Sequence, residues 1–528
     1  MPSVKRKAVE IDSLVGGLDT FINPTEIDDS STPDCDNVIP TGKGGIRTRL
    51  GRVKRGGEIT SGYGGQGGFT YIKSDNTVEE LNITNGVLKK KNGDSWDTIS
   101  GGTFSTTARV YGVQVGSRLY FADGETALCY YNGTEISTAG INSAPLPSFL
   151  IFFNRRIYCN DIDHPDRYYF GGAMASDGTV TNTGDFRSTS PAYGGYAGFG
   201  LGEIAGGLAK LGSSYLIVGL RKRIHRISPT SDTGVSSALT HAEELVSGSI
   251  GFANHGSIDN VENDLAFLSW GDIYLLGEVA SYTSLRTRVI STKVSTTIQG
   301  ISASMIPKTT MLYSPKHNKL YFGYADGTAY NNKVLVYDTY YKSWWRYSNW
   351  SPACFLEFVD ENNQDYLIYV SDNPSDSYCY LINSTANDDG SAIPWHWKSK
   401  VFDLKGFDVL KKFKRRVVLF GPIYGTVTIT VYIGGTGNTS KFQVGSLSGS
   451  AGLGCVPLGR VPLGRDENEF TLETVANDWR WKRIARPNEA TNIQIKFSGD
   501  GVGEAGQIEK FKFYYNENLR KKDRSKRI

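Results

Sequence analysis

Short hydrophobic segments separated by polar turns recur along most of this sequence. The segment Arg118–Ala122 is followed by Asp123-Gly124 and then by Leu128–Tyr131. A similar order returns between Thr310 and Tyr347, where Asp326-Gly327 separates two apolar segments. Alternation of apolar and polar positions with a period of two indicates β-strands, and Asp-Gly between two such segments is a strong hairpin signal. The pattern therefore predicts a succession of β-hairpins.

Weaker copies of this hairpin unit are spaced roughly 40–60 residues apart, close to the length of one β-propeller blade. A blade of about four short strands cannot bury both faces of its sheet alone, whereas a ring of blades can. We therefore expect a β-propeller of five to seven blades. A β-helix is the nearest rival, but it would need shorter and more regular repeats. The weaker copies lie at Gly68–Ile72, Ile151–Cys159, Tyr215–Ile227, Leu265–Leu276 and Tyr366–Leu381.

The two ends of the chain have different patterns from the repeats. Residues 1–55 are rich in Gly, Asp, Pro, Ser and Thr with little periodicity, which predicts an extended N-terminal arm. Residues 56–390 form the expected propeller body. Residues 391–519 contain longer alternating segments, of which Thr426–Ile433 is the cleanest, and are expected to form a C-terminal β-sandwich-like domain. Residues 520–528 are expected to be a mobile basic tail. The fold class is therefore all-β.

Composition agrees with this prediction and narrows the classes of function. Glycine supplies 61 of 528 residues and aromatic residues 12%, which suits tight turns and pleated surfaces. A formal net charge of +3 gives no general attraction to nucleic acid or to a membrane. No run of 18 apolar residues occurs, so we expect no transmembrane helix and no membrane insertion. The opening segment lacks an apolar h-region, so we expect no secretory signal.

Candidate chemistry is sparse. The sequence contains no GxSxG, P-loop, HExxH or EF-hand motif, and we expect no catalytic residue, no cofactor and no metal site. The six cysteines have no CxxC spacing and are expected to be free, mostly buried thiols. The densest acidic cluster is Asp161-Ile-Asp163-His164-Pro-Asp166. Its oxygen ligands could suit calcium, but a polar turn is the favoured interpretation.

An aromatic cluster near residue 340 also has two interpretations. Its side chains could stack on sugar rings or could fill the space between blades, and packing is favoured. The cluster comprises Tyr337, Tyr340, Tyr341, Trp344, Trp345, Tyr347 and Trp350.

Two basic segments are the candidate interface. The segment from Lys43 to Arg55 holds six basic residues and no acidic one, and the C-terminal tail has a second cluster. Such a segment is either a solvated linker or an arm that docks on an acidic neighbouring subunit or on phosphate. We expect the acidic subunit rather than DNA. The candidate residues are Lys43, Arg47, Arg49, Arg52, Lys54, Arg55, Arg520, Lys521 and Lys522.

The N-terminal segment resembles the opening of the tail nozzle proteins of short-tailed bacteriophages, the tail tubular protein B or tail-hub group. The similar residues are Gly16–Thr20, Asn23-Pro24, Ser31–Val38, Gly44–Arg49 and Gly51-Arg52. In that group a "GGL…N…" segment precedes an "N…G.L..R.G" segment and a propeller.

Two later stretches are similar to the same group. One lies in the expected propeller and the other in the expected C-terminal domain, while the large insertions that some members carry are lacking. The similar residues are Gly248–Phe252, His255–Ser257, Asn263–Leu268, Gly271–Tyr274, Trp397, Asp403-Leu404 and Lys411–Arg416.

The resemblance implies a structural virion protein without enzymatic activity. Such nozzles form a six-fold ring below the portal and adaptor around the DNA exit channel, and take part in genome retention and ejection. The implied partners are further copies of the chain, head-tail adaptor or connector proteins, tail fibres or spikes, and genomic DNA in transit. The implied location is the phage tail of the virion, after assembly in the host cytoplasm. The alternative hypothesis is a carbohydrate-binding or depolymerase-type propeller tail protein.

Overall fold

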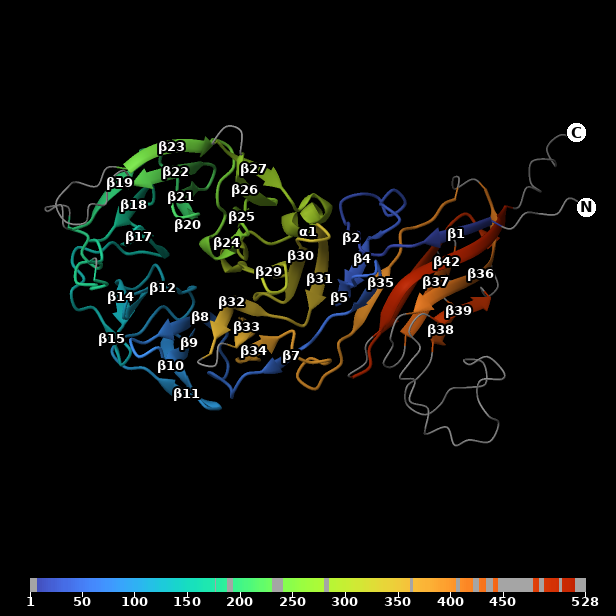
Figure 1. Cartoon of the computed structure of the whole chain (residues 1–528), viewed down its shortest axis with the longest axis horizontal. Helices are drawn as coiled ribbons and strands as arrows, with labels where there is room; N and C mark the ends of the chain where they lie inside the picture. Colours follow the sequence, from blue (N-terminus) through green and yellow to red (C-terminus); the bar gives the residue numbers. More distant parts are fainter. Residues whose placement is uncertain are drawn as a thin grey trace, which may run out of the picture. The chain divides into compact units, whose positions relative to one another are not determined.

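The computed structural model describes residues 7–175, 177–187, 193–229, 241–279, 284–360, 364–404, 409–420, 427–433, 440–444, 478–483, 489–502 and 506–517. These residues are almost entirely in strands and turns (Figure 1). The helices among them are short: α1 (Ser295–Gln299) and the 3-10 turns η1 (His255–Ser257), η2 (Thr292–Val294) and η3 (Ile306–Lys308). Within the described ranges no helix is long and apolar enough to cross a membrane. The all-β prediction is confirmed.

The described residues form seven four-stranded sheets that follow one another along the chain (Figure 1). The first four sheets consist of β8 (Gly65–Ile72), β9 (Val78–Thr84), β10 (Val87–Asn92) and β11 (Ser95–Thr98); β12 (Tyr111–Val115), β13 (Arg118–Ala122), β14 (Cys129–Tyr131) and β15 (Ile136–Ser137); β16 (Leu150–Phe153), β17 (Arg156–Asn160), β18 (Arg167–Phe170) and β19 (Gly195–Gly198); and β20 (Ala205–Leu211), β21 (Tyr215–Leu220), β22 (Ile224–Pro229) and β23 (His241–Ser247).

The last three sheets repeat this arrangement, with one exception in the seventh. They consist of β24 (Ile258–Val261), β25 (Asp264–Leu268), β26 (Ile273–Val279) and β27 (Ser284–Val289); β28 (Thr310–Ser314), β29 (Lys319–Tyr324), β30 (Lys333–Asp338) and β31 (Ser343–Ser348); and β32 (Pro352–Val359), β33 (Asp365–Ser371), β34 (Cys379–Ile382) and β7 (Arg52–Lys54).

The order of contacts closes the seven sheets into a ring. The first strand of each sheet contacts the first strand of the next, and β32 of the seventh sheet contacts β8 of the first. The outer strand of the seventh sheet is β7, which precedes the first sheet in the sequence. A ring in which an early strand completes the last sheet leaves no open end between the first and last blades. The architecture is a seven-bladed β-propeller, at the upper end of the predicted range.

Local sequence explains the hairpins that build each blade. Between Val115 and Arg118, a two-residue turn contains Gly116 at a φ of 54°. Between Phe153 and Arg156, both turn residues, Asn154 and Arg155, have positive φ (45° and 62°). Positive φ at both central positions defines the type I′ turn, whose twist matches that of paired strands. Asparagine tolerates this conformation better than most residues.

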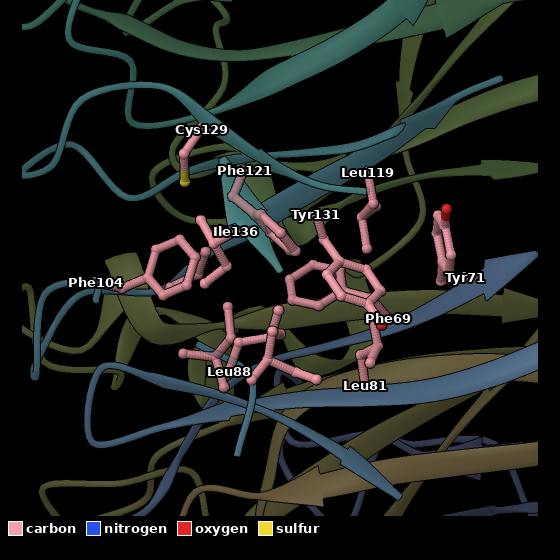
Figure 2. Packing of buried hydrophobic residues seen from close by; sticks show 13 residues of the cluster. Phe69, Tyr71, Leu81, Leu88, Phe104, Leu119, Phe121, Cys129, Tyr131 and Ile136 are labelled. Carbon is pink, nitrogen blue, oxygen red and sulfur yellow. The ribbon is translucent and has the colours of Figure 1, made fainter. Parts of the chain in front are cut away.

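Aromatic and aliphatic side chains fill the spaces between blades. The cluster between the first two sheets holds 13 buried residues, 10 of which are labelled in Figure 2. In it, the Phe69 and Phe121 rings lie 5.2 Å apart and the Tyr71 and Tyr131 rings 5.0 Å apart, both edge to face. Edge-to-face pairs stabilise by about 0.5–1.5 kcal/mol beyond their area burial. Similar clusters follow between later blades.

The C-terminal residues form a separate two-sheet structure. The sequence pattern of strand β41 explains how its sheet buries one face. Burial alternates strictly from Ile493 to Gly499, which places Ile493, Ile495 and Phe497 on one buried face. Facing rings come from the two sheets, since Phe497 and Phe511 lie 5.6 Å apart and Trp397 and Phe511 lie 6.1 Å apart. Two sheets with a shared aromatic core form a β-sandwich, as predicted.

Both sheets of the sandwich contain strands from the start of the chain. The seven-stranded sheet joins β39 (Asp478–Arg483), β36 (Lys411–Phe420), β42 (Gln507–Glu517), β6 (Ile46–Thr48) and β5 (Val38–Pro40), with β1 (Lys7–Ile11) beside β42 and β40 (Glu489–Ala490) beside β36. The five-stranded sheet joins β38 (Ser440–Val444), β37 (Val427–Ile433), β41 (Ile493–Gly499), β35 (Trp395–Lys398) and β4 (Asp34–Asp36). A short parallel pair joins β2 (Gly17–Leu18) and β3 (Ser31–Thr32).

The chain divides into two compact units. One comprises residues 1–53, 337–348 and 383–528, and the other residues 54–336 and 349–382. The segment expected to be an extended N-terminal arm, residues 1–55, pairs with strands from other parts of the chain where it is described. The described part of that segment supplies β4 to one sheet of the sandwich and β5 and β6 to the other. Its apolar residues, such as Leu18, Val38 and Ile46, are buried accordingly.

Candidate functional site

The predicted basic interface is only partly exposed. Lys43 lies in the turn before β6 and Arg47 lies on β6, and both side chains are exposed. Arg47 is paired across the sheet with Gln507 of β42. These two residues remain available to a partner. The tail residues Arg520, Lys521 and Lys522 lie outside the described residues.

Arg49 has a structural role instead. Its side chain is 2% exposed and forms a bidentate pair with Asp388, at 2.9 Å from Nη1 to Oδ1 and 2.7 Å from Nη2 to Oδ2. Its Nε donates to Asn37 Oδ1 at 2.7 Å, and its Nη2 donates to the Ser348 carbonyl at 3.0 Å. A buried charge is tolerated only when its hydrogen-bonding groups are satisfied in this way. We call Asn37, Arg49, Ser348 and Asp388 the Arg49 clasp.

Asn37 makes further hydrogen bonds within the clasp, and two glycines of the N-terminal segment pack against the same two later segments of the chain. Asn37 has a φ of 56° and donates from Nδ2 to Ser348 Oγ and to the Pro394 carbonyl. At Gly17, with a φ of 74°, a Cβ would lie 2.7 Å from the Trp344 carbonyl oxygen, and at Gly51 it would lie 1.9 Å from the Asn387 carbonyl oxygen. Neither position can hold a side chain without moving the backbone. Three segments far apart in the sequence therefore meet here.

The remaining basic candidates also pack against their own unit. Lys54 Nζ lies 4.1 Å from the Tyr378 ring centroid. Arg55 Nε bonds Glu80 Oε2 at 2.7 Å, and its guanidinium lies over the Phe358 and Tyr366 rings. Arg52 is half-buried on β7. The sequence run that looked like one exposed arm thus separates into two exposed residues and four that serve the fold.

The axis of the propeller holds a narrow chamber. It has a volume of about 350 Å³ and is lined by the first strand of each blade and by η1. This is the lower end of the range for small-molecule pockets. Arg109 at its wall pairs with Asp372 at 2.9 Å and donates to the Gly65 carbonyl. His255 stacks on Phe149 at 4.9 Å and lies edge to face with Tyr111 at 4.8 Å.

Burial shifts the pKa of three groups around the chamber. It raises the pKa of Asp259 to about 6. Two backbone N–H groups that donate to this carboxylate, Tyr313 N at 2.6 Å and Asn260 N at 2.8 Å, act in the opposite direction and lower the pKa. Burial lowers the pKa of His255 to about 4, and His255 Nδ1 accepts from Leu208 N. It raises the pKa of Tyr111 to about 12. Each shift favours the neutral form, as expected in a confined site of low polarity.

A wider cavity, the axial mouth, adjoins the chamber. It has a volume of about 910 Å³ and shares Lys210 and Asn260 with the chamber. It is built from the turns between the first and second strands of the third, fourth and fifth blades. Its lining is polar on the turns and aromatic at Phe152 and Tyr215. The full lining is Phe152, Phe153, Asn154, Lys210, Leu211, Gly212, Ser213, Ser214, Tyr215, Asn260, Glu262, Asn263 and Asp264.

The other sequence candidates have ordinary structural roles. His164 Nδ1 lies 2.9 Å from Asp161 Oδ2, and Asp161 Oδ1 accepts from Leu146 N, so this acidic cluster is a hydrogen-bonded turn. Among the described residues no group of three acidic, histidine or cysteine side chains could hold a metal. In the aromatic cluster, Tyr340 is 78% exposed, whereas Trp344, Trp345, Tyr347 and Trp350 are buried. Packing is thus the role of most of the cluster.

Sequence reasoning did not identify the Arg49 clasp or the axial mouth. Asp388 and Ser348 have no sequence signal beyond that of turn residues. Their structural role depends on hydrogen bonds to Arg49, some 300 positions away in the sequence. The mouth residues Ser213, Ser214 and Asn263 lie in turns between strands. Only the convergence of three turns on one axis gives them a common cavity.

No protein-family model and no curated protein matches this sequence. Among solved structures, BamB from Moraxella catarrhalis has a TM-score of 0.35 and 10% identity, and covers 67% of this chain and 94% of that chain. BBS1N in complex with ARL6DN has a TM-score of 0.39 and 9% identity, and covers 63% and 97%. YCF48 bound to D1 peptide has a TM-score of 0.35 and 9% identity, and covers 62% and 95%. Such distant likenesses carry no argument about function.

Proposed function

We propose that this protein is a structural subunit of the nozzle or hub ring of a phage tail, located in the virion below the portal and adaptor. The ring surrounds the DNA exit channel and takes part in retaining and ejecting the genome. The observation that carries the proposal is the Arg49 clasp. Four residues that carry the sequence resemblance contact β31 or the 383–391 segment: Asn37 and Arg49 hydrogen-bond in the clasp, while Gly17 packs against Trp344 and Gly51 against Asn387.

This convergence supports the resemblance as a likeness of architecture. Short motifs of glycine, asparagine and arginine can match by chance when each residue lies on a separate loop. Here each matching residue meets a defined structural requirement, since Gly17 and Asn37 adopt positive φ, Gly51 allows close backbone approach, and Arg49 holds a satisfied buried charge. A common set of such requirements favours a common way of joining the N-terminal segment to the sandwich.

The axial chamber is too small to serve as the DNA channel in this proposal. Its volume of about 350 Å³ is that of a small-molecule pocket. A DNA duplex, whose major groove alone is about 12 Å wide, does not fit in such a space. DNA would therefore pass through the lumen formed between copies of the chain and not through the propeller. The net charge of +3 suits a lumen that does not hold DNA by many phosphate contacts.

The proposed partners are further copies of the chain in a six-fold ring, the adaptor or connector proteins above it, and tail fibres or spikes. A closed ring needs heterologous interfaces in which two different surfaces of one chain meet. Lys43 and Arg47 are the exposed remainder of the basic segment, and we assign them to an acidic surface of a neighbouring subunit. The role is structural and not enzymatic in this proposal.

Labelled particles test the proposal. A gold-labelled antibody fragment against this protein is bound to intact virions and located by electron microscopy. We expect it to mark the tail below the portal. Labelling of fibres alone, or release of a neutral polysaccharide's reducing ends by the pure protein, would contradict it and favour the depolymerase alternative.

A further inference from the structure

We infer that the axial mouth of the propeller is a binding site for a neutral oligosaccharide. The mouth is concave and about 910 Å³ in volume, near the upper end of the range for small-molecule sites. Its lining combines side-chain amides, hydroxyls and aromatic rings.

The polar groups of the mouth are available to a ligand. Within the part of the chain that the structure describes, the side-chain amides of Asn154, Asn260 and Asn263 have no hydrogen-bond partner, and the hydroxyls of Ser213 and Ser214 have none either. All five residues are exposed; Asn260 lies on β24 and the other four lie on the turns. An amide offers two donors and an acceptor, and a hydroxyl offers one donor and an acceptor. Such groups match the vicinal hydroxyls of a sugar, which also donate and accept.

The aromatic residues add an apolar surface to the same cavity. Phe152 and Tyr215 line the mouth and are half-buried. The guanidinium of Arg226 lies 4.6 Å from the Tyr215 ring centroid, which helps to fix the ring. An aromatic face that is held in place can pack against the C–H face of a pyranose at little conformational cost.

The charges of the mouth argue against charged ligands. The lining has one cation, Lys210, and two carboxylates, Glu262 and Asp264, and Arg288 lies 3.5 Å from Asp264. A phosphate or nucleic acid would meet the carboxylates with a single lysine to attract it, whereas phosphate sites gather several cations or backbone donors. A polyamine would meet Lys210. A neutral polyhydroxylated ligand avoids both costs.

The site is placed on three rigid turns. Each turn joins the first and second strands of one blade, and the three blades are neighbours. The turns are Asn154-Arg155, Gly212–Ser214 and Glu262-Asn263. Positive φ at Asn154 (45°), Gly212 (61°) and Glu262 (56°) marks tight turns. A site built on short turns between strands needs little ordering when the ligand binds.

Titration calorimetry and saturation-transfer NMR on the full chain test this inference. The probes are maltohexaose and N-acetylchitohexaose as neutral oligosaccharides, and a heparin hexasaccharide and inorganic phosphate as anions. We expect saturable binding of a neutral hexasaccharide and none of the anions. Asn260→Ala with Asn263→Ala, and separately Ser213→Ala with Ser214→Ala, should weaken that binding about tenfold or more.

Ser117→Ala is the matched control, because Ser117 is an exposed serine in the equivalent β12–β13 turn but does not line the mouth. It should leave the affinity unchanged. Failure of both neutral probes to bind, preferential binding of heparin or phosphate, or equal affinity in the mouth variants and the wild type would each overturn the inference. The ring proposal would stand or fall separately, because these readouts do not involve assembly.

Discussion

At the scale of single residues, the most consequential charge is the buried guanidinium of Arg49. Its partners come from residues 37, 348 and 388. A lysine could not reproduce the two parallel bonds to a carboxylate. The Arg49 side chain therefore ties three chain segments of one unit together, and removing either member of the Arg49–Asp388 pair leaves the other charge buried without compensation.

We predict that Asp388→Ala lowers the free energy of unfolding of this unit by about 3–5 kcal/mol, the usual cost of breaking a buried ion pair. Urea unfolding followed by tryptophan fluorescence measures the effect. Arg47→Ala is the control and should change stability by no more than about 0.5 kcal/mol, because Arg47 is exposed. Equal effects of the two substitutions would show that the clasp contributes nothing special.

A second residue-scale effect depends on pH. Asp259 has a folded pKa of about 6, against about 3.9 when unfolded. The stability associated with its neutral form is fully present below about pH 4 and is lost as the pH rises through about 6. For His255, with a folded pKa of about 4 against about 6.5 when unfolded, stability is present above about pH 6.5 and is lost as the pH falls through about 4. The two residues therefore oppose each other between these limits.

Asp259→Asn should therefore raise stability relative to the wild type more at pH 7.5 than at pH 4, because the variant has no charge to bury. Urea midpoints at the two pH values provide the measurement. Asp94→Asn, at an exposed turn residue, serves as the comparison and should show no such difference. If the urea midpoints of Asp259→Asn and the wild type differed by the same amount at both pH values, the Asp259 carboxyl would not be confined in the chamber.

At the scale of elements, the sequence pattern predicts hairpins well and long-range pairings poorly. The hairpins at Asp123-Gly124 and Asp326-Gly327 and the strand that begins near Thr426 follow from local alternation and turn chemistry, and the structure has them. The N-terminal strands β4, β5 and β6 are three residues long, too short for periodicity to appear. β4 pairs with β35, β6 pairs with β42, and β5 pairs with β6. These pairings are set by tertiary packing, which no local pattern encodes.

Two truncations separate the roles of these N-terminal elements. Removing residues 1–40 takes away β1–β5 but keeps β7, the outer strand of the seventh blade. Removing residues 1–54 takes away β7 as well. We expect the propeller's thermal transition to persist in the first truncation and to fall in the second, because the second exposes the edge of β34. Differential scanning calorimetry of both proteins provides the measurement.

The sandwich should be destabilised in both truncations, since β4 and β5 leave its sheets. Its loss in either is compatible with the fold. Loss of the propeller transition already on removal of residues 1–40 would contradict the assignment of ring closure to β7.

At the scale of the whole molecule, the proposal concerns assembly. Among the described candidate residues, Lys43 and Arg47 are exposed, whereas Arg49, Lys54 and Arg55 bind within their own units. Lys43→Glu with Arg47→Glu should weaken association of copies while leaving the thermal transitions in place, since exposed charges add little to stability. Sedimentation velocity compares this variant with the wild type. If the variant associated as strongly as the wild type, the interface between copies would not include Lys43 and Arg47.

The most direct test of the central claim is the mass of the protein in solution, alone and after mixing with the portal–adaptor complex of the same virion, by native mass spectrometry. The account predicts a closed six-fold ring that forms on, or is stabilised by, the adaptor. A chain that stays a monomer or trimer and ignores the adaptor would contradict it.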